Sequence, residues 1–466
     1  MNSNNLILNT DSYKASHFLQ YPPGTEYVSS YVESRGGRYS QTLFFGLQAF
    51  LKQYLTSPIT RDDIDEAESL LTLHGLPFNR NGWNYILEQY GGYLPLSIEA
   101  VPEGSVIPTS NVMMQVVNTD SRVPWLTSYL ETALLRAIWY PTTVATFSFQ
   151  VRQLIKAYLE ETAVSVDGLA FKLHDFGARG ASSDETAALG GLAHLVNFQG
   201  TDTVAALIAA RRWYGAEMAG FSIPAAEHST ITAWGEENEE AAYRNMLKQF
   251  AGEGRLVAVV SDSYDLWNAL DNLWGGSLRK EVMRNGGTVV IRPDSGDPVK
   301  VVTKTIECLI RKFGAEQNAK GFWVLPDYIR VIQGDGISPD SIADILAAMK
   351  AKKLSAENIA FGMGAALLQK VNRDTLRFAM KASAICIEGQ WRDVYKDPVT
   401  DPGKRSKAGR LALVEERGNL TTIRQESASD QNLLVEVFRN GELLQEWSFE
   451  QVRQRAANAA NNLGRA

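Results

Sequence analysis

Short apolar runs that stop abruptly at a polar or glycine-rich cluster constrain this sequence more than any other feature. A β-branched run that ends in polar residues and then turns helical is typical of a parallel strand, which delivers side chains to the carboxyl edge of a sheet. Five such runs follow one another, so the sequence predicts an active site assembled from several strand ends. Their clusters occupy residues 174–180, 261–265, 292–296, 333–336 and 362–364.

The spacing of these runs predicts the fold class. Strand and helix patterns alternate at intervals of roughly 30 to 40 residues, which indicates an α/β fold with an irregular, barrel-like parallel domain over residues 164–375. Residues 1–163 have the mixed pattern of an α+β domain. Asn440-Gly441 predicts a hairpin within residues 376–466. Because one hairpin is unstable alone, we expect this β-rich C-terminal segment to pack back on the N-terminal domain.

Helical periodicity in the N-terminal domain predicts amphipathic helices at residues 42–54 and 61–73. Two more helical segments, 125–139 and 144–162, lie on either side of Pro141. Because proline lacks a backbone N–H and its ring clashes with the preceding turn, we expect Pro141 to separate two helices.

Composition and charge exclude several classes of protein. The net charge of -7 and the pI near 5.5 argue against bulk nucleic-acid binding, which needs a surplus of Lys and Arg. No apolar stretch approaches the roughly 18 residues of a membrane span, and residues 1–11 lack the basic and apolar segments of a signal peptide. Cys308 and Cys386 are too few for a disulfide framework. We therefore expect a soluble, cytoplasmic protein.

Aspartates follow several of the predicted strands. One aspartate alone is explained equally well by a turn or a helix cap. Five on one edge would repel one another unless a cation or a polyhydroxyl ligand lies among them, so the pattern favours Mg²⁺ and a sugar. The residues are Asp175, Asp202, Asp262, Asp294 and Asp335.

Arginines and glycine turns at the same edge favour phosphate as a ligand. Arg179 and Arg292 carry planar guanidinium groups that suit phosphate oxygens, with a structural ion pair as the alternative. The turns at 334–336 and 362–364 permit close backbone approach to a phosphate, although GxG also occurs in ordinary turns. A separate basic run indicates either a second anion site or a solvated loop, and consists of Lys396, Lys404, Arg405, Lys407 and Arg410.

One histidine and two aromatic residues are also candidates for the site. His228 lies among small residues, where an accessible imidazole can act as a base or nucleophile, although a lone histidine is more often structural. Phe176 and Tyr13 lie beside polar motifs. Core packing is the ordinary role of such rings, and stacking on a planar heteroaromatic ring is the alternative.

The ordered motifs resemble those of the nicotinamide phosphoribosyltransferases, a family of type II phosphoribosyltransferases. The match runs from Asp11-Ser12-Tyr13-Lys14 to Lys404-Arg405-Ser406-Lys407 and so covers nearly the whole chain. Its most specific motifs occupy residues 172–180, 200–203, 222–234, 261–265, 291–296 and 396–398. The resemblance implies an enzyme of NAD salvage that joins nicotinamide to phosphoribosyl pyrophosphate (PRPP), giving nicotinamide mononucleotide and pyrophosphate.

The resemblance also implies how the base is bound. Phe176 and Tyr13 would sandwich the pyridine ring, with Tyr13 arriving from a second subunit of a homodimer. Asp202 would accept a hydrogen bond from the carboxamide N–H. A nicotinate carboxylate would meet like charge there, so Asp202 is expected to set the preference for the amide.

The remaining site residues are implied by their matching positions. Arg179, Arg292 and Asp294 would hold phosphate and ribose, and Asp262 would support the ribose or the metal region. Mg²⁺ and basic groups would absorb the charge of the departing pyrophosphate. The 5'-phosphate would lie at residues 334, 335 and 364, and several of the basic groups would act across the dimer interface. The further substrate-binding positions are Ser222, Gly334, Asp335, Gly364, Ala365, Arg35, Arg373, Lys381, Lys396 and Lys404.

His228 matches a histidine that the family phosphorylates transiently when ATP hydrolysis is coupled to the synthesis. Met363, Ala365 and Ala379 stand where related sequences have serine or glycine. We expect these departures to alter phosphate affinity rather than the reaction.

Three alternative functions remain open. The closest is the same chemistry on nicotinate. A metal-dependent lyase acting on a sugar phosphate would need a metal cage, yet the sequence has no HxH or HExxH spacing. A non-catalytic binding protein would not need intact catalytic motifs.

Overall fold

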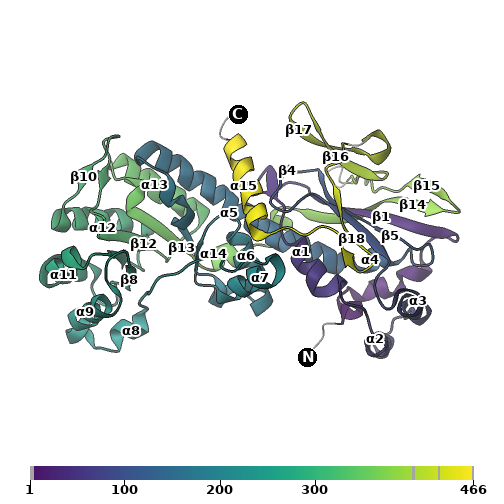
Figure 1. Ribbon diagram of the computed structural model, residues 1–466, viewed down its shortest axis with the longest axis horizontal. Coiled ribbons are helices and arrows are strands. Elements are labelled where there is room, and N and C mark those ends of the chain that lie inside the picture. The colour runs from purple at the N-terminus through teal and green to yellow at the C-terminus, as the bar shows by residue number, and fades with distance from the viewer. Residues whose placement is uncertain (1–4, 401–404, 429–430, 464–466) are drawn as a thin grey trace. The chain divides into compact units, whose positions relative to one another are not determined.

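The computed structural model describes residues 5–400, 405–428 and 431–463. The chain forms two compact units (Figure 1). We call them the antiparallel unit, which comprises Met1–Thr146, Arg211–Ala216 and Asn372–Ala466, and the parallel unit, which comprises Phe147–Ala210 and Glu217–Val371. The boundaries at residues 163 and 375 that the sequence suggests stay a prediction.

The parallel unit is built on a six-stranded sheet in which every neighbouring pair is parallel. This confirms the barrel-like parallel α/β domain that the alternating pattern predicts. Strand order differs from chain order, as is usual when helices connect parallel strands. In order across the sheet, the strands are β7 (Gly200–Thr201), β6 (Leu173–Asp175), β13 (Ile359–Met363), β12 (Ile329–Gln333), β9 (Thr288–Arg292) and β8 (Leu256–Val260).

Helices follow these strands, and α12 (Pro298–Phe313) shows why the sequence forms them. The Asp297 side chain accepts a hydrogen bond from the Lys300 backbone N–H at 3.0 Å, and Pro298 occupies the first turn. The helix ends where Gly314 adopts a φ of 83°. Other helices that begin in this unit are α6 (Asp184–His194), α7 (Val204–Tyr214), α8 (His228–Thr232), α9 (Glu239–Phe250), α11 (Arg279–Arg284), α13 (Pro339–Ala351) and α14 (Ala365–Leu368).

The antiparallel unit contains a seven-stranded sheet to which both ends of the chain contribute. Strand β18 pairs with β3, and β14 pairs with β1, so the C-terminal segment does complete the N-terminal α+β domain. The predicted hairpin at Asn440-Gly441 is also present, because β18 pairs with β19. In order, the strands are β15 (Gln390–Asp393), β14 (Phe378–Ile387), β1 (Thr25–Ser34), β5 (Val112–Asn118), β3 (Leu96–Ala100), β18 (Val435–Arg439) and β19 (Glu442–Leu443).

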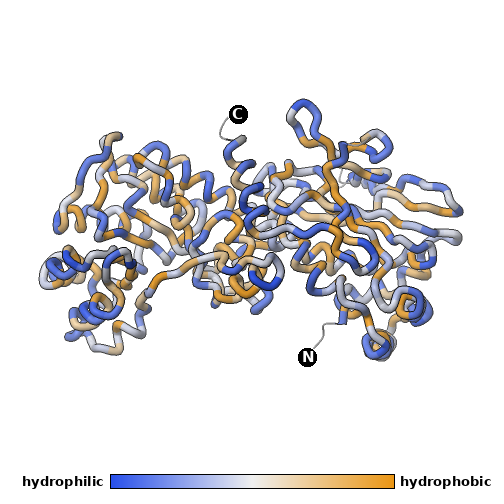
Figure 2. The backbone as a smooth tube through the Cα atoms, in the orientation of Figure 1, coloured by the Kyte–Doolittle hydropathy of each residue, from blue (hydrophilic) through white to orange (hydrophobic). Residues whose placement is uncertain are grey.

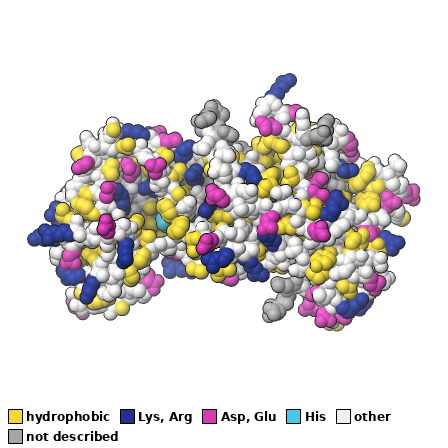
Figure 3. Space-filling model, in the orientation of Figure 1, with side chains coloured by type: hydrophobic (Ala, Val, Ile, Leu, Met, Phe, Trp, Pro, Cys, Tyr) yellow, Lys and Arg dark blue, Asp and Glu magenta, His cyan; other side chains and the backbone are white. Residues whose placement is uncertain are grey.

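One face of this sheet is covered by apolar side chains and helices, among them α2 (Arg61–Leu73), α3 (Arg80–Tyr90) and α4 (Leu126–Tyr129). Ile98 and Val116 of the sheet share the buried cluster with Trp83 of α3. The strands of this sheet contain hydrophobic stretches, whereas the turn of the hairpin formed by β16 (Leu411–Glu416) and β17 (Asn419–Arg424) is hydrophilic (Figure 2). Figure 3 shows Lys and Arg side chains interspersed with Asp and Glu side chains on the face in view.

The expectation that Pro141 separates two helices is wrong, because α5 runs unbroken from Glu131 to Thr162 with Pro141 inside it. Tertiary contacts hold the helix at this point. The Thr142 hydroxyl accepts a hydrogen bond from the Phe45 backbone N–H at 3.2 Å, and Gly46 leaves room for the proline ring, since a Cβ there would lie 2.3 Å from Pro141 Cγ. Packing thus overrides the local preference of proline.

The helix expected at 42–54 is present only in part. Residues Gln41–Leu43 form β2, which pairs with β4 (Val106–Pro108), and helical structure begins at α1 (Leu47–Phe50). The helix predicted at 61–73 has those bounds as α2. Within the described ranges, no helix combines the length and the apolar character that crossing a bilayer requires.

Candidate active site

The carboxyl ends of the parallel strands bring the predicted polar clusters to one edge. The register pairs Val260 of β8 with Arg292 of β9, and Met363 of β13 with Asp175 of β6. Asp175 in turn pairs with Thr201 of β7. Because the last residues of the strands are neighbours, the loops that follow them must also be neighbours.

His228 and Asp262 form a hydrogen-bonded pair at this edge. The Nε2 atom of His228 lies 2.9 Å from Asp262 Oδ1, and the histidine side chain is 47% exposed while the aspartate is only 5% exposed. The segment before His228 is held to β8, since the Ala226 backbone N–H donates to the Ala258 carbonyl at 2.9 Å. A buried carboxylate therefore fixes the orientation of an accessible imidazole.

Arg292 and Asp294 lie next to this pair. Arg292 Nη2 is 3.5 Å from Asp294 Oδ2. Burial raises the pKa of Asp294, and the nearby carboxylates of Asp262 and Asp335 raise it further, whereas Arg292 and His228 oppose the rise. His228 and the residues from three strand ends, Asp262, Arg292, Asp294 and Asp335, thus interact electrostatically in one place.

The Arg292 guanidinium also has an unused donor. Its Nε atom is buried and has no hydrogen-bond partner among residues 5–400, 405–428 and 431–463. Arg292 lines the central cavity of the unit. A buried donor without a partner is costly, so this N–H is suited to an anionic ligand in the cavity.

The Phe176 ring is placed by two glycines. A Cβ at Gly362 would lie 1.9 Å from Phe176 Cε2, and one at Gly334 would lie 3.6 Å from the same atom. The Phe176 backbone N–H donates to the Met363 carbonyl at 3.0 Å. The glycines that the sequence associates with phosphate therefore also make room for an aromatic ring.

Asp202 and Ser222 form the polar part of the cavity wall. The Ser222 hydroxyl donates to Asp202 Oδ1 at 2.5 Å. The Asp202 backbone N–H donates to the Asp175 carbonyl at 3.0 Å, which ties the loop after β7 to the end of β6. Within the part of the chain that the structure describes, the second oxygen of Asp202 has no hydrogen-bond donor and is available as an acceptor toward a ligand.

A cavity of about 440 Å³ lies beside some of these groups. It extends along the strands, because its lining includes Leu256, the first residue of β8, as well as Arg292, the last residue of β9. Its floor is largely apolar and includes Val290 and Ile332. Residues from the predicted site that line it are Phe176, Asp202, Ser222 and Arg292.

Asp175 does not join the other strand-end aspartates. Its side chain is fully buried, and its Oδ1 atom accepts a hydrogen bond from the Gly177 backbone N–H at 2.7 Å. Its Oδ2 atom is 3.4 Å from the Thr201 hydroxyl. Burial raises the pKa of Asp175, and these hydrogen bonds oppose the rise. Asp175 thus holds the loops that carry Phe176 and Asp202 rather than facing a ligand.

Arg179, Gly364 and Ala365 lie in two adjoining turns. Arg179 is exposed in a single 3-10 turn, Ala178–Gly180, after β6. Ala365 begins α14 directly after Gly364, and a Cβ at Gly180 would lie 2.9 Å from the Ala365 Cβ. The turn that bears Arg179 is therefore packed against the turn expected to receive a phosphate.

Sequence analysis missed Lys172 and His174, which also line the cavity. Lys172 Nζ donates to three backbone carbonyls, those of Ala356, Glu357 and Ile359, at 2.8 to 3.2 Å. Burial lowers the pKa of Lys172 to about 7. Both residues belong to the motif at 172–180, but nothing in the local pattern indicates that they face the cavity.

The antiparallel unit gathers a separate group of basic side chains, in which Glu33 and Glu131 are the counter-charges. Arg35 Nε lies 2.8 Å from Glu33 Oε1, and Lys407 Nζ lies 2.6 Å from Glu33 Oε2. Arg35 Nη2 is buried without a hydrogen-bond partner in the described part of the chain. Three basic residues predicted from separate motifs, Arg35, Arg373 and Lys381, interact here.

Lys381 is the centre of this basic group. Its Nζ lies 3.8 Å from Glu131 Oε1, and Lys14 Nζ lies 2.7 Å from Glu131 Oε2. Burial lowers the pKa of Lys381, Glu131 opposes this, and the neighbouring cations Arg35, Lys14 and Arg373 lower it further. The sequence motif that contains Lys14 and Tyr13 thus contributes a basic residue that we had not predicted.

The other candidates of this unit are placed as follows. Tyr13 is 57% exposed, and its ring packs edge-on against His17 at 5.3 Å. Lys396 is fixed through its backbone, whose N–H donates to the Ser406 hydroxyl at 2.7 Å. Ala379 is buried in β14. Lys404 lies outside the described residues.

No three His, Cys, Asp or Glu side chains in the described part of the chain are grouped so that they could hold a metal ion by themselves. Asp262 is nevertheless close enough to Asp294 to raise the pKa of that carboxyl. Mg²⁺ commonly uses one or two carboxylates together with substrate phosphates and water, and these two residues fit that arrangement.

The comparisons with known proteins agree with this architecture. Residues 171–442 match the nicotinate phosphoribosyltransferase (NAPRTase) family, and residues 5–98 match the N-terminal domain of nicotinamide phosphoribosyltransferase. The chain therefore belongs to the nicotinate phosphoribosyltransferase family. This assignment covers both the strand-edge motifs and the N-terminal segment.

Two curated relatives match nearly the full length. A nicotinamide phosphoribosyltransferase from Xanthomonas campestris pv. campestris is 56% identical and covers 97% of this chain and 98% of its own. One from Acinetobacter baylyi is 33% identical and covers 96% of each chain.

Two solved structures share the fold at low identity. Nicotinate-nucleotide pyrophosphorylase from Pyrococcus furiosus has a TM-score of 0.64 at 16% identity, with 100% of this chain and 98% of that chain covered. Human nicotinic acid phosphoribosyltransferase has a TM-score of 0.56 at 18% identity, with 97% and 93% covered.

Proposed function

We propose that this protein transfers the phosphoribosyl group of PRPP to nicotinamide, giving nicotinamide mononucleotide and pyrophosphate in NAD salvage. The observation that carries the proposal is the cavity in which Phe176, Asp202 and Arg292 meet. The 56% identity to a nicotinamide phosphoribosyltransferase over nearly the whole chain supports it.

Asp202 and Phe176 select the base. The pyridine ring stacks on Phe176, and the free oxygen of Asp202 accepts a hydrogen bond from the carboxamide N–H. Ser222 holds the other Asp202 oxygen and so fixes the carboxylate. A nicotinate carboxylate would lie against a negative charge, which disfavours it.

Arg292 and Asp294 act on the phosphoribosyl part of the substrate. As the bond from the anomeric carbon to pyrophosphate breaks, positive charge develops on the sugar and negative charge on the leaving group. Arg292 and Arg179 stabilise phosphate oxygens, and Asp294 accepts hydrogen bonds from ribose hydroxyls. The turns with Gly334, Asp335, Gly364 and Ala365 receive the 5'-phosphate.

Asp262 and Asp294 are the residues that would hold Mg²⁺ together with the pyrophosphate of PRPP. The bound ion would neutralise charge on the leaving group. The protein's own part is to orient both carboxylates, Asp262 through its contact with His228 and Asp294 through its ion pair with Arg292.

His228 couples ATP hydrolysis to the synthesis through a phosphohistidine. Because Nε2 of His228 faces Asp262, Nδ1 is the nitrogen available for phosphorylation. Nδ1 forms a bond to the γ-phosphorus of ATP as the bond to ADP breaks, and water later releases phosphate. We expect the ratio of the rates with and without ATP to fall to about one in His228→Ala, and an unchanged ratio would remove this step from the account.

The active site is completed by Tyr13 of the partner subunit in a homodimer. Five basic residues bind phosphate groups, several of them across the dimer interface: Arg35, Arg373, Lys381, Lys396 and Lys404. The unused Arg35 donor and the mutual repulsion of the basic group support a role in binding an anion. We place the enzyme in the cytoplasm, since Cys308 and Cys386 are both free.

Mixed dimers test the shared site. Tyr13→Ala and Asp294→Asn should each be nearly inactive alone. If Tyr13 acts in the neighbouring subunit, random mixing gives one competent site in each mixed dimer and restores about one quarter of wild-type activity. Absence of any recovery in dimers shown to be mixed would contradict sharing.

The activity itself is tested by incubating the protein with nicotinamide, PRPP and Mg²⁺ and measuring nicotinamide mononucleotide. We expect product without ATP and more with it. No product under either condition would overturn the proposal. Nicotinate phosphoribosyltransferase activity is the second candidate because the matched family carries that name, and equal competition between the two bases would favour it.

A further inference from the structure

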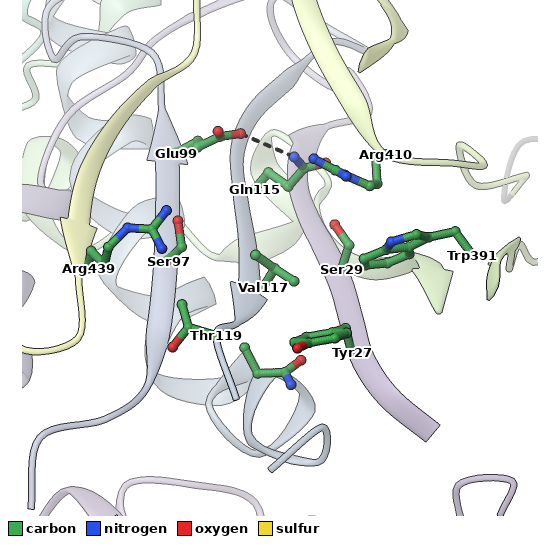
Figure 4. Close-up of a pocket in the computed structure, with 11 residues that line it drawn as sticks. Tyr27, Ser29, Ser97, Glu99, Gln115, Val117, Thr119, Trp391, Arg410 and Arg439 are labelled. Atoms are coloured by element: carbon green, nitrogen blue, oxygen red, sulfur yellow. Dashed lines mark hydrogen bonds between the residues drawn. The ribbon is translucent and has the colours of Figure 1, made fainter. Parts of the chain in front are cut away.

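We propose that a second cavity, on the seven-stranded sheet of the antiparallel unit, binds a nucleoside monophosphate. The cavity measures about 300 Å³ and is lined entirely by residues of this unit. Figure 4 shows two aromatic rings on one side, Tyr27 and Trp391, with Arg439 and Ser97 opposite them and Val117 between. The proposal does not depend on the proposed transferase activity.

The aromatic side of the cavity suits a planar base. Tyr27 comes from β1 and Trp391 from β15, and their rings lie 6.2 Å apart at an angle of 23°. Trp391 is 41% exposed. Two nearly parallel rings on a sheet face, one of them widely exposed, form a platform on which a heteroaromatic base can stack.

Arg410 provides the group for a phosphate. Its guanidinium carbon lies 5.4 Å from the centre of the Trp391 ring, so the cation is held beside the platform. In the described part of the chain, Arg410 has neither an ion pair nor a side-chain hydrogen bond. By contrast, Arg439 is paired with Glu436 at 2.6 Å. Arg410 is therefore the guanidinium with free donors for an anion.

Glu99 provides acceptors of the kind that bind ribose hydroxyls. Gln115 Nε2 donates to Glu99 Oε2 at 3.3 Å, and Gln115 Oε1 accepts from the Leu411 backbone N–H at 2.8 Å. This bridge links Glu99 to the segment that carries Arg410, and Figure 4 shows its hydrogen bond between Gln115 and Glu99. Burial raises the pKa of Glu99, and Glu436 adds to the rise, while Arg410 and Arg439 oppose it. The carboxylate is thus partly desolvated with spare acceptor capacity.

Size and chemistry together limit the ligand. A cavity of about 300 Å³ is at the lower end of small-molecule sites, which span roughly 300 to 1,000 Å³. It matches one base, one ribose and one phosphate rather than a dinucleotide. Base, diol and phosphate require an aromatic face, an acceptor and a cation, which Trp391, Glu99 and Arg410 supply around one space.

Two classes of nucleotide combine a base, a ribose and a phosphate in this way. One is an adenine nucleotide such as AMP, and the other is a pyridine nucleotide such as nicotinamide mononucleotide. The binding experiment separates them by using both ligands on the same protein. An Arg292→Ala background weakens binding of the pyridine nucleotide at the strand-edge cavity, so that the cavity of the antiparallel unit is measured alone.

The test is isothermal titration of the full-length Arg292→Ala protein with AMP, nicotinamide mononucleotide, adenosine and inorganic phosphate. We expect saturable binding of at least one nucleotide, with adenosine and phosphate each at least tenfold weaker. Trp391→Ala and Arg410→Gln should each weaken nucleotide binding at least tenfold. Trp323→Ala, which removes a comparably exposed tryptophan from the parallel unit, should leave it unchanged.

Circular dichroism of each variant establishes that it is folded, and substitution of two exposed side chains should preserve the sheet. The more strongly bound nucleotide identifies the source. The proposal would be overturned if neither nucleotide showed saturable binding up to about 10 mM. A dissociation constant above that concentration means a binding free energy weaker than ~3 kcal/mol. Nucleotide binding that is equally strong in Trp391→Ala and Arg410→Gln would overturn it as well.

Discussion

The two units assemble charged groups in different ways. In the parallel unit, the groups follow strands that end at one edge, so the register of the sheet alone brings Arg292, Asp294 and Asp262 together. In the antiparallel unit, basic residues come from separate strands and loops, and two carboxylates hold them, the buried Glu33 and the partly exposed Glu131. The first arrangement leaves its charges available to a ligand, whereas the second satisfies most of them internally.

The carboxylates of the two units differ accordingly. Glu33 is nearly inaccessible and interacts with Arg35 and Lys407, so it is a structural counter-ion. Among the described residues, Asp294 has a single ion pair, at 3.5 Å, and its pKa is raised, first by burial. A carboxylate that is destabilised in the folded protein is typical of a functional site, and a fully paired one of structure.

The largest expected effect is on catalysis by Asp294→Asn. Loss of the ribose acceptor should lower kcat/KM for PRPP at least a thousandfold. The melting temperature should stay the same or rise, because the substitution removes a charge that burial disfavours. Steady-state kinetics and calorimetry measure both, with Asp344→Asn on the exposed face of α13 as the matched control. A destabilised Asp294→Asn protein would remove the contrast with Glu33.

Glu33→Gln should have the opposite profile. The amide would leave Arg35 and Lys407 without their counter-charge, which should lower the free energy of unfolding by about 4 kcal/mol. Urea denaturation gives this value, and Glu316→Gln, at an exposed position in the parallel unit, is the control. A loss below about 1 kcal/mol would show that Glu33 is not the structural counter-ion described above.

Glu103 gives a pH-dependent test of the antiparallel unit. Burial raises its pKa to about 7, although hydrogen bonds from the Tyr214 hydroxyl and the Gln48 and Gly46 backbone N–H groups oppose the rise. The folded state therefore binds a proton more tightly than the unfolded state, whose pKa is near 4.5. The contribution of Glu103 to the free energy of unfolding is therefore complete below pH 4.5 and is lost as the pH rises through 7.

The expected size of this effect is about 3 kcal/mol between those pH values. Glu103→Gln keeps an acceptor for both backbone N–H groups and cannot titrate, so its stability should lack this slope. Denaturation from pH 4.5 to 8 measures the difference between the two proteins. Parallel pH profiles for wild type and Glu103→Gln would contradict the assignment.

The smallest expected effect is on base selection by Asp202→Ala. Removal of the acceptor should reduce the preference for nicotinamide over nicotinate about thirtyfold, or ~2 kcal/mol. Competition between the two bases at equal concentration measures this ratio. Ser222→Ala, which removes only the hydroxyl that holds Asp202, should have a weaker effect in the same direction. An unchanged ratio in Asp202→Ala would place base selection elsewhere.

The strand-end groups could be predicted because each is marked locally by an apolar run followed by a polar cluster. Asp294 and Asp262 need no knowledge of the partner strands to be recognised. Asp175 has the same local signal, yet burial assigns it to structure, and only the pairing of β6 with β7 and β13 reveals this. Pro141 shows the converse, since contacts from Phe45 and Gly46 override a strong local signal.

The counter-ions of the antiparallel unit could not be predicted in this way. Glu33 and Lys407 lie 374 positions apart in the chain and meet only when the C-terminal segment joins the N-terminal sheet. A single sequence carries no local mark of such a pair. The family resemblance predicts that Arg35 and Lys381 bind phosphate, but it gives no account of which residues hold them in place.

The most direct test of the central claim, that the carboxyl edge of the parallel sheet is the active site, is a crystal structure with nicotinamide mononucleotide bound. We predict that the pyridine ring stacks on Phe176 and that its amide lies within hydrogen-bond distance of Asp202. The phosphate should lie at the turns containing Gly334 and Gly364. A nucleotide bound only at the cavity between Tyr27 and Arg439, with the strand-edge residues making no contact to it, would contradict the account.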